Sequence, residues 1–564
     1  MPIDPLVRSR HSLLAFCVAA AALGSARAQT AMATDRAVGA TLVTVPHCKE
    51  WLGTLASPEF EGRGTGQPGF EKAANYVAAH FKSLGLEARG EKGSYFQHVP
   101  WASSKVNAAK TRVVFRKGDA EVCTIPADRL TGSASSNLAA TGDVVLLVVN
   151  APTPPPVQPG RQGDRPGAAA ASIPGLDAVD VKGKVVIAYV RPAAERTARQ
   201  TAMAQFAVRQ GLQGKEAAAV LFVQTEAVTG GLRGGSGMGR RGGNPAAAGA
   251  GRSPVDASFG GADFDAVLVG AGLSKDMLTD APIATVLPLQ GTVEVAVEET
   301  QAPAMNVWAV LPGSDAKLKD EYVVIGSHLD HLGRRGDTIS PGADDDASGT
   351  TGVMALAQMF AKNPVRPTRS ILFVCFSGEE NGLVGSRFFA DNCPVPLASI
   401  VGELQMDMIG RDEEENVEGN QGEKAEDNRN SLHLIGTKKL APALHDLCIS
   451  KNEAAKFDIE YDQEGMYSRS DHANFARHGV PIAFFFTGLH RDYHRPSDTP
   501  DKIHYEKLLR VATYVYDIAF ELATQSSRPM IDPALWEKFR AGSRNNAPEV
   551  PAAPMQPGAP STGK

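Results

Sequence analysis

The stretch SILFVCFSGEE, residues 370–380, decides the fold class of this 564-residue chain. Its first seven residues are nearly all apolar, and Glu379 and Glu380 follow after a short turn. A strand that is apolar on consecutive residues is buried on both faces of its sheet. Similar runs alternate with stretches of helical periodicity through the second half of the chain. Strands are predicted at Tyr322–Ser327, Ser370–Phe376, Ile400–Met406, Leu432–Ile435 and Ile482–Phe486, and helices at residues 347–362, 383–391, 439–451, 471–478 and 504–524. This alternation predicts an α/β domain with a mixed, mainly parallel sheet sandwiched by helices.

Acidic and imidazole side chains follow the ends of these strands. Open α/β sheets bind ligands beyond the carboxyl ends of their strands, so we expect these side chains to converge in one crevice. Each segment alone has an ordinary structural explanation, such as a capping histidine or acids beside a helix dipole. Together, however, the carboxylates would repel one another unless cations neutralised them. Imidazoles and carboxylates without cysteines suit zinc. The segments are Ser327–His331, Pro341–Gly349, Ser377–Glu380, Gln405–Met408 and Asp492–Asp498.

These motifs, in this order, resemble the family of secreted double-zinc aminopeptidases, which includes aminopeptidase S, aminopeptidase Y and the glutamate carboxypeptidase relatives. The motifs are His-x-Asp, Gly-Ala-Asp-Asp-x-Ala-Ser-Gly, Ser-Gly-Glu-Glu, Met-Asp-Met and Tyr-His-x-x-x-Asp. The resemblance covers about residues 303–525 and, more weakly, 49–118, where Glu61-Gly62-Arg63-x-Thr65-Gly66 is similar to the family's entry segment. It implies the zinc exopeptidase fold, two Zn²⁺ ions per chain, and peptide substrates with a free N-terminus.

The resemblance also implies a role for each motif residue. His328 and Asp407 would hold one zinc, Glu380 and His494 the other, and Asp344 would bridge them. Glu379 would be the general base that takes a proton from the water shared by the two metals and passes it to the leaving amine. Asp330 would orient His328. A non-proline cis peptide is expected at Asp344–Asp345, and Asp345 is expected either to support the ligands from behind or to contact the substrate.

Four further residues are candidates for contact with substrate. Asp471 and His472 lie in a Ser-Asp-His segment that the family often has near the substrate, although it also reads as a helix N-terminus. Tyr467 or Tyr493 would donate a hydrogen bond to the oxyanion of the tetrahedral intermediate, or would simply pack in the pocket wall. By contrast, surface roles are expected for His331, His490 and Arg411, and a solvated loop for the acidic run Asp412–Asp427.

The ends and the middle of the chain differ in composition from this domain. Arg8 and Arg10, the apolar run Leu13–Leu23 and the Ala-x-Ala pattern ending at Ala28 predict a signal peptide at residues 1–28, hence export to the periplasm or medium, with no membrane span. We predict the catalytic domain at 45–120 and 299–540. A β-rich insert at 121–298 resembles a protease-associated domain, with low-complexity loops at 152–171 and 230–251. A disordered tail is predicted at 541–564.

Composition narrows the function classes further. The net charge of −6 argues against nucleic acid as a partner. Five cysteines remain after the leader and no CxxC motif occurs, so at least one thiol is unpaired, although export permits a disulfide. The alternatives to an aminopeptidase are a carboxypeptidase or dipeptidase of the same fold, a glutaminyl cyclase, and a non-catalytic binding protein on this fold. Oligomeric state and side-chain preference are not readable from the sequence.

Overall fold

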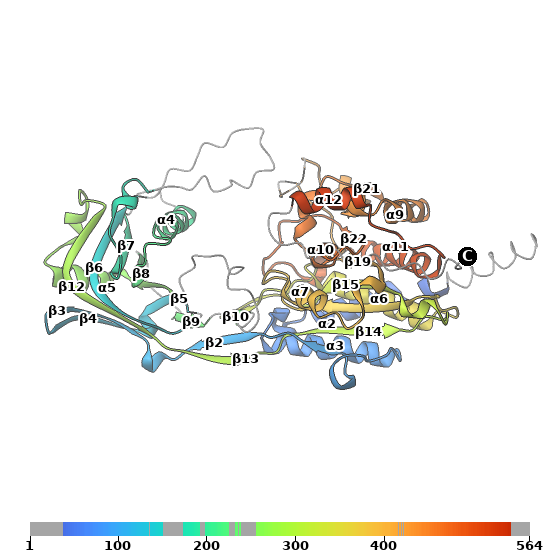
Figure 1. Cartoon of the computed structure of the whole chain (residues 1–564), viewed down its shortest axis with the longest axis horizontal. Coiled ribbons are helices and arrows are strands. Elements are labelled where there is room, and N and C mark those ends of the chain that lie inside the picture. Colours follow the sequence, from blue (N-terminus) through green and yellow to red (C-terminus); the bar gives the residue numbers. More distant parts are fainter. Residues whose placement is uncertain are drawn as a thin grey trace, which may run out of the picture. The chain divides into compact units, whose positions relative to one another are not determined.

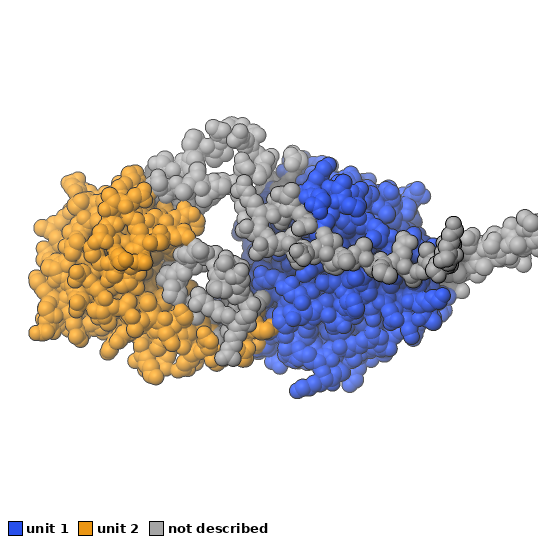
Figure 2. Space-filling view, in the orientation of Figure 1, with its two compact units in different colours: residues 1–99, 303–564 blue, residues 100–302 orange. Residues whose placement is uncertain are grey.

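The computed structural model describes residues 38–134, 136–150, 173–191, 198–224, 232–234, 236–237, 255–415, 417–418, 420 and 422–542. The predicted signal peptide, the tail from 543 onward, the 152–171 loop and most of the 230–251 loop lie outside these residues. The chain forms two compact units, residues 1–99 with 303–564 and residues 100–302, which are coloured separately in Figure 2.

The first unit is built on an eight-stranded mixed sheet in the order β1-β14-β18-β15-β19-β22-β20-β21 (Figure 1). The four central strands β18, β15, β19 and β22 run parallel to one another, whereas β14 and β20 are antiparallel to their inner neighbours. The strands are β1 (Phe96–His98), β14 (Met305–Leu311), β15 (Tyr322–His328), β18 (Ser370–Phe376), β19 (Ile400–Met406), β20 (Ser431–Ile435), β21 (Asp458–Glu460) and β22 (Ile482–Phe486). A separate two-stranded ribbon pairs β16 (Gly333–Arg335) with β17 (Thr338–Ser340).

Helices cover both faces of this sheet. Along β15, Val323 and Ile325 belong to one hydrophobic cluster, and Tyr322 and Val324 belong to another. The first cluster contains side chains of α2 (Val45–Leu55), α3 (Pro68–Ser83), α6 (Ala347–Lys362), α9 (Pro442–Ala455) and α11 (Tyr505–Thr524). The second contains those of α7 (Val384–Asp391), α8 (Thr437–Leu440), α10 (His472–Arg477) and α12 (Pro533–Gly542). The strands are therefore apolar on consecutive residues because each face packs against its own layer of helices.

The predicted α/β architecture is confirmed for this unit. All five predicted strands are present, three of them with the predicted bounds, and α6 spans the predicted residues. The strands predicted from the sequence do not include β14 or the two short edge strands β1 and β21. Each of these edge strands pairs over only three residues. Strands this short carry too few residues for a period to be visible.

The second unit is β-rich. Its main sheet has nine strands in the order β4-β3-β12-β6-β7-β8-β11-β5-β9, and a smaller sheet has the order β10-β2-β13. The strands are β2 (Ala102–Val106), β3 (Arg112–Lys117), β4 (Ala120–Pro126), β5 (Leu130–Ala134), β6 (Leu138–Val149), β7 (Val185–Val190), β8 (Ala219–Gln224), β9 (Leu232–Gly234), β10 (Ser236–Gly237), β11 (Val255–Gly260), β12 (Ala284–Val295) and β13 (Val297–Gln301), with helices α4 (Ala198–Gly211) and α5 (Gly261–Ala271).

The boundaries of this unit differ from the prediction. The unit begins at Pro100 and ends at Ala302, rather than spanning 121–298. Residues 100–120 belong to it because β2 pairs with β13 and β3 pairs with β12, pairings between segments that are distant in sequence. Composition alone does not reveal such pairings.

Two smaller observations concern the described part of the chain. Its five cysteines, Cys48, Cys123, Cys375, Cys393 and Cys448, are all free thiols. None of its helices is at once long enough and apolar enough to cross a lipid bilayer.

Candidate metal centre

Asp346 joins the three chain segments that form the site. It is the N-cap of α6, where its Oδ1 accepts the Gly349 N–H at 2.8 Å. The same carboxylate accepts the Met408 N–H at 3.1 Å and the His328 N–H at 3.2 Å. The carboxyl ends of β15 and β19 are thereby tied to the start of α6. This explains locally why the strand-end motifs converge.

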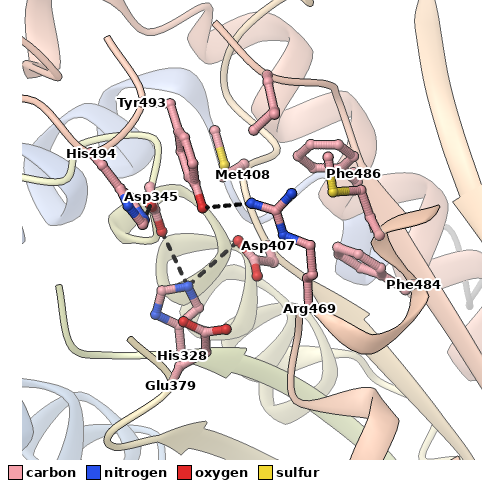
Figure 3. A pocket seen from close by; sticks show the side chains of 12 residues that line it. His328, Asp345, Glu379, Asp407, Met408, Arg469, Phe484, Phe486, Tyr493 and His494 are labelled. Atoms are coloured by element: carbon pink, nitrogen blue, oxygen red, sulfur yellow. Dashed lines mark hydrogen bonds and ion pairs between the residues drawn. The ribbon is translucent and has the colours of Figure 1, made fainter. Parts of the chain in front are cut away.

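Two groups of potential metal ligands share Asp345. In the first, Nε2 of His328 lies 3.2 Å from Asp345 Oδ1 and 3.5 Å from Asp407 Oδ1 (Figure 3). In the second, Nδ1 of His331 lies 2.7 Å from Glu380 Oε1 and 3.6 Å from Asp345 Oδ2. Nε2 of His494 is 3.2 Å from both Asp345 Oδ2 and Glu380 Oε2. One carboxylate thus faces a different group with each of its oxygens.

The sequence predicts Asp344 as the bridging residue, but it is Asp345 that lies between the two groups. Asp344 Oδ1 accepts the Gly410 N–H at 2.7 Å, and its Oδ2 lies 3.3 Å from His490 Nε2, outside both groups. The cis peptide likewise lies one residue later than expected, at Asp345–Asp346. Three consecutive aspartates allow this error, because the spacing of the motif does not distinguish which of them faces the crevice.

The donor set of these groups fits zinc. Imidazole nitrogens and carboxylate oxygens without thiolates form the mixed shells typical of catalytic zinc sites. Several buried donor atoms, including Asp345 Oδ2, Glu380 Oε1 and both ring nitrogens of His331, have no hydrogen-bond partner within the described residues. Burial alone would lower the pKa of His328, but Asp407, Glu379 and Asp346 raise it well above its ordinary value. The site is therefore electrostatically prepared for positive charge.

Glu379 lies in the wall of a pocket that also contains His328, Asp345, Asp407 and His494 (Figure 3). Burial raises the pKa of its carboxyl well above the usual range, and the charges of Asp407 and Asp471 raise it further. Its backbone N–H donates to Asp330 Oδ1 at 3.1 Å, which fixes the turn after β18. The remaining wall is largely apolar and consists of Met408, Met466, Phe484, Phe486 and Leu489, together with Arg469 and Tyr493.

The side chains behind the ligands differ partly from expectation. His328 Nδ1 lies 3.0 Å from the backbone oxygen of Asp330 but 3.9 Å from its carboxylate, so the closer contact is with the main chain. Ser470, by contrast, donates to Asp407 Oδ2 at 2.7 Å. Ser470 in turn accepts from the Gln405 side chain at 3.2 Å. The Ser-Asp-His segment, residues 470–472, does not by itself predict this contact of Ser470 with Asp407.

The four candidate substrate residues separate into two kinds. Tyr493 lines the pocket, where its ring stacks on His494 and its hydroxyl accepts from Arg469 at 3.4 Å. Tyr467, Asp471 and His472 are buried and do not line the pocket. The His472 ring stacks on the back of Phe484, with 4.6 Å between the ring centroids, so it supports the pocket wall.

Several residues expected at the surface are buried. His331, His490 and Arg411 are 2%, 2% and 7% exposed. The start of the acidic run is also buried, because Asp412 pairs with Lys507 at 2.7 Å and Glu413 is completely enclosed. A charged stretch indicates a solvated loop only when no distant segment covers it, and the sequence does not tell which segments do so.

Two further residues lie in motifs that resemble the family, but the sequence predicted no role for them. The Asp498 carboxylate accepts the N–H groups of Asp344 and Asp345 at 3.0 and 3.2 Å. Arg63, fully buried, donates to the carbonyls of Leu55, Leu329, Pro341 and Gly342. It therefore holds the His-x-Asp loop against the Asp345 loop, which explains why the entry segment accompanies the ligand motifs.

Part of the chain is similar to a known protein family. Residues 306–519 match the family model of Peptidase family M28. We call these matched residues the M28 segment. The M28 segment contains every residue of the two ligand groups, as well as Glu379 and the pocket wall.

The chain is similar to curated proteins over part of its length. It is 30% identical over 227 residues to a probable leucine aminopeptidase of Arthroderma otae, a match that covers 39% of this chain and 57% of the relative. It is 26% identical over 273 residues to leupeptin-inactivating enzyme 1 of Streptomyces exfoliatus, covering 45% and 55%. The chain thus spans little more than half the length of these relatives. Among solved structures, the aminopeptidase from Aneurinibacillus sp. strain AM-1 covers 88% of this chain and 97% of its own, with 21% identity and a TM-score of 0.49.

Proposed function

We propose that the M28 segment is a metallo-aminopeptidase that holds two zinc ions and hydrolyses the N-terminal residue of peptides, with Glu379 as general base. The observation that carries this proposal is Asp345, whose Oδ1 faces His328 and whose Oδ2 faces His494, each at 3.2 Å. A carboxylate that offers one oxygen to each of two ligand groups is the arrangement that a two-metal hydrolase requires.

In this proposal His328, Asp345 and Asp407 hold one zinc, and Asp345, Glu380 and His494 hold the other. His331, beside Glu380, completes the second group. When bound, the zinc ions polarise the scissile carbonyl and lower the pKa of water. Ser470 fixes the orientation of Asp407 through its hydrogen bond, the kind of support that ligating side chains usually need.

Glu379 does the proton transfer. Its carboxylate takes a proton from the attacking water and delivers it to the leaving amine, and its backbone contact with Asp330 holds it in the pocket wall. Tyr493, which lines the same pocket, would donate a hydrogen bond to the tetrahedral oxyanion.

The pocket wall favours a substrate with an apolar first side chain. Met408, Met466, Phe484, Phe486 and Leu489 would surround that side chain, in keeping with the leucine aminopeptidase names of the relatives. The substrate's free amino group would be attracted by the carboxylates of the ligand groups. We extend the proposal to export by the predicted signal peptide, with the second unit as a protease-associated domain that carries no catalytic residue.

A second candidate, a carboxypeptidase or dipeptidase of the same fold, is favoured by Arg469. Its guanidinium lines the pocket beside Tyr493, where it would pair with a substrate carboxylate. The same group already lies 3.1 Å from Glu418, which neutralises part of its charge. Peptides blocked at one end separate the candidates. An aminopeptidase cleaves C-terminally amidated peptides but not N-acetylated ones, and a carboxypeptidase does the reverse.

The decisive experiment compares Glu379→Gln with its neighbour Glu380→Gln on a panel of N-terminal amino-acid anilides. We expect Glu379→Gln to lower kcat by about 10²–10⁴-fold while zinc per chain stays as in wild type, because it removes a general base and no ligand. Glu380→Gln should lose both zinc and activity. A zinc-loaded wild type that releases no amino acid would refute the aminopeptidase assignment. The remaining candidates would then be a carboxypeptidase or dipeptidase, a glutaminyl cyclase, or a non-catalytic binding protein on this fold.

A further inference from the structure

A second cluster of titratable side chains lies outside the pocket and has no part in the proposed reaction. It consists of Glu413, His433, Glu460 and Asp462, which we call the His433 cluster. His433 is on β20 opposite Glu460 of β21, Glu413 belongs to the segment after β19, and Asp462 follows β21. His433 and Glu413 are completely buried, whereas the Glu460 and Asp462 side chains are 25% and 32% exposed.

Carboxylates face both nitrogens of the His433 ring. On one side, Nδ1 lies 3.1 Å from Asp462 Oδ1 and 3.5 Å from Glu460 Oε2. On the other, Nε2 lies 3.6 Å from Glu413 Oε2. One ligand atom from each of Glu413, His433 and Glu460 lies within 4.8 Å of the others. Within the described residues, neither ring nitrogen has a hydrogen-bond partner of acceptable geometry.

The charges of the cluster are out of balance. No lysine or arginine of the described chain forms an ion pair with Glu413, Glu460 or Asp462. Burial opposes a charged imidazole, yet the three carboxylates raise the pKa of His433 to about 9. A protonated ring offsets one of the three negative charges, whereas a divalent cation beside a neutral ring offsets two. The position therefore favours a dication over a proton.

The other oxygens of the cluster are already engaged. Gln463 donates to Glu413 Oε1 at 2.7 Å, and Ser431 donates to Glu460 Oε1 at 2.5 Å. These bonds turn Glu413 Oε2 and Glu460 Oε2 toward the histidine. A carboxylate behind a ligating imidazole, accepting its second N–H, is the usual support of a metal-bound histidine.

We propose that His433 Nδ1, Glu460 and Asp462 bind a divalent cation of the zinc class, with the Glu413 carboxylate facing Nε2 on the other side of the ring. One nitrogen and two oxygen donors, completed by water, suit tetrahedral zinc. Calcium prefers six to eight oxygen ligands, and magnesium keeps most of its water, so both fit less well. The proposal does not depend on the chemistry of the pocket.

The cation would have a structural role. It would fasten β21 and the segment after it to β20, and through Glu413 it would hold the beginning of the acidic run. His433 also lies opposite Phe486 of β22, with the two rings 5.7 Å apart. Phe486 in turn lines the pocket, so loss of the cation would loosen the back of the pocket wall without removing a pocket residue.

The test uses the full-length protein, stripped with chelator, reloaded with zinc and dialysed. Zinc per chain is measured by mass spectrometry in wild type, in Glu460→Gln/Asp462→Asn, and in Asp458→Asn as a matched control. Asp458 lies on the same strand as Glu460 but outside the cluster. We expect the double variant to bind one zinc fewer than wild type and Asp458→Asn to bind the same number. We also expect zinc to raise the Tm of the pocket variant Asp345→Asn, but not when the double substitution is added.

Equal zinc content in wild type and the double variant would overturn the proposal and leave His433 as a protonated ion-pair partner. The proposal would also be overturned if zinc did not raise the Tm of Asp345→Asn. If the double variant does not fold, the single variant Asp462→Asn tests the proposal instead. Asp462 is the most exposed residue of the cluster, so its substitution disturbs the fold least. It should bind the additional zinc at least about 10-fold more weakly while its circular dichroism is unchanged. Unchanged affinity in this variant would also contradict the site.

Discussion

At the scale of single residues, two neighbouring aspartates have opposite surroundings and therefore different predicted roles. Asp345 faces imidazoles of both ligand groups, whereas Asp344 accepts a backbone N–H from Gly410 and lies beside His490. We predict that Asp345→Asn lowers zinc affinity by more than the 10–100-fold typical of outer residues and abolishes activity. Asp344→Asn should keep the zinc content of the wild type and lose stability instead. The measurements are zinc content and unfolding by urea, and an Asp345→Asn variant with the zinc content of the wild type would contradict the bridging role.

His472 gives a prediction about pH. Burial lowers its pKa from 6.5 to about 3, so in the folded protein the ring stays neutral. At a pH between about 3 and 6.5, His472 binds a proton in the unfolded chain but not in the folded protein. The stabilisation is therefore complete above about pH 6.5 and is lost as pH falls toward 3. At pH 5 the loss is about 2 kcal/mol relative to pH 8. His472→Leu removes the group that takes up this proton. The free energy of unfolding of the variant should therefore fall less between pH 8 and 5 than that of wild type. Parallel pH curves for the two proteins would show that the ring does not titrate in this way.

At the scale of elements, the contact between α6 and β19 fixes the site. A Cβ at Gly349, in the first turn of α6, would lie 2.3 Å from the Met406 carbonyl oxygen. Gly349→Ala must therefore push the helix away from the strand, at a cost of about 1–3 kcal/mol or more, and zinc affinity should fall with it. Gly53 in α2 is the matched control, because no described atom lies within 4 Å of its Cβ position. Gly53→Ala should stabilise the protein by about 0.5–1 kcal/mol through helix propensity. Urea unfolding measures both, and equal stability of the two variants would contradict the close contact.

At the scale of the whole molecule, the chain leaves and re-enters the first unit at adjacent points. The Val99 N–H donates to the Ala304 carbonyl at 2.9 Å, and β1 pairs with β14 directly beside it. Residues 100–302 have hydrophobic clusters of their own. Replacing them by a short glycine-serine linker should therefore leave a folded first unit that binds the same zinc and cleaves the same anilides. Circular dichroism and zinc content check this, and aggregation of the shortened chain would show that the first unit needs the insert.

Much of the first unit could be predicted from sequence because its signals are local. The apolar runs that became β18, β19 and β22 show their burial residue by residue, and the acids after them mark the strand ends. The ligand motifs were recognisable for the same reason, since each occupies a few consecutive residues. Edge strands such as β21 and the limits of the insert depend on pairing with distant segments, and were missed or misplaced.

Local sequence patterns are enough to predict the fold class of the first unit, the segments that meet at its strand ends and the chemical type of the side chains there. Which atoms of these side chains meet depends on the tertiary structure. It selected Asp345 over Asp344, buried His331 beside Glu380, placed Arg469 in the pocket wall and enclosed His433 among three carboxylates. The physical reason is the distance along the chain over which each feature is set. Periodicity and strand ends are set by neighbouring residues, whereas the direction of a side chain at the end of a strand is set by packing against segments a hundred or more positions away.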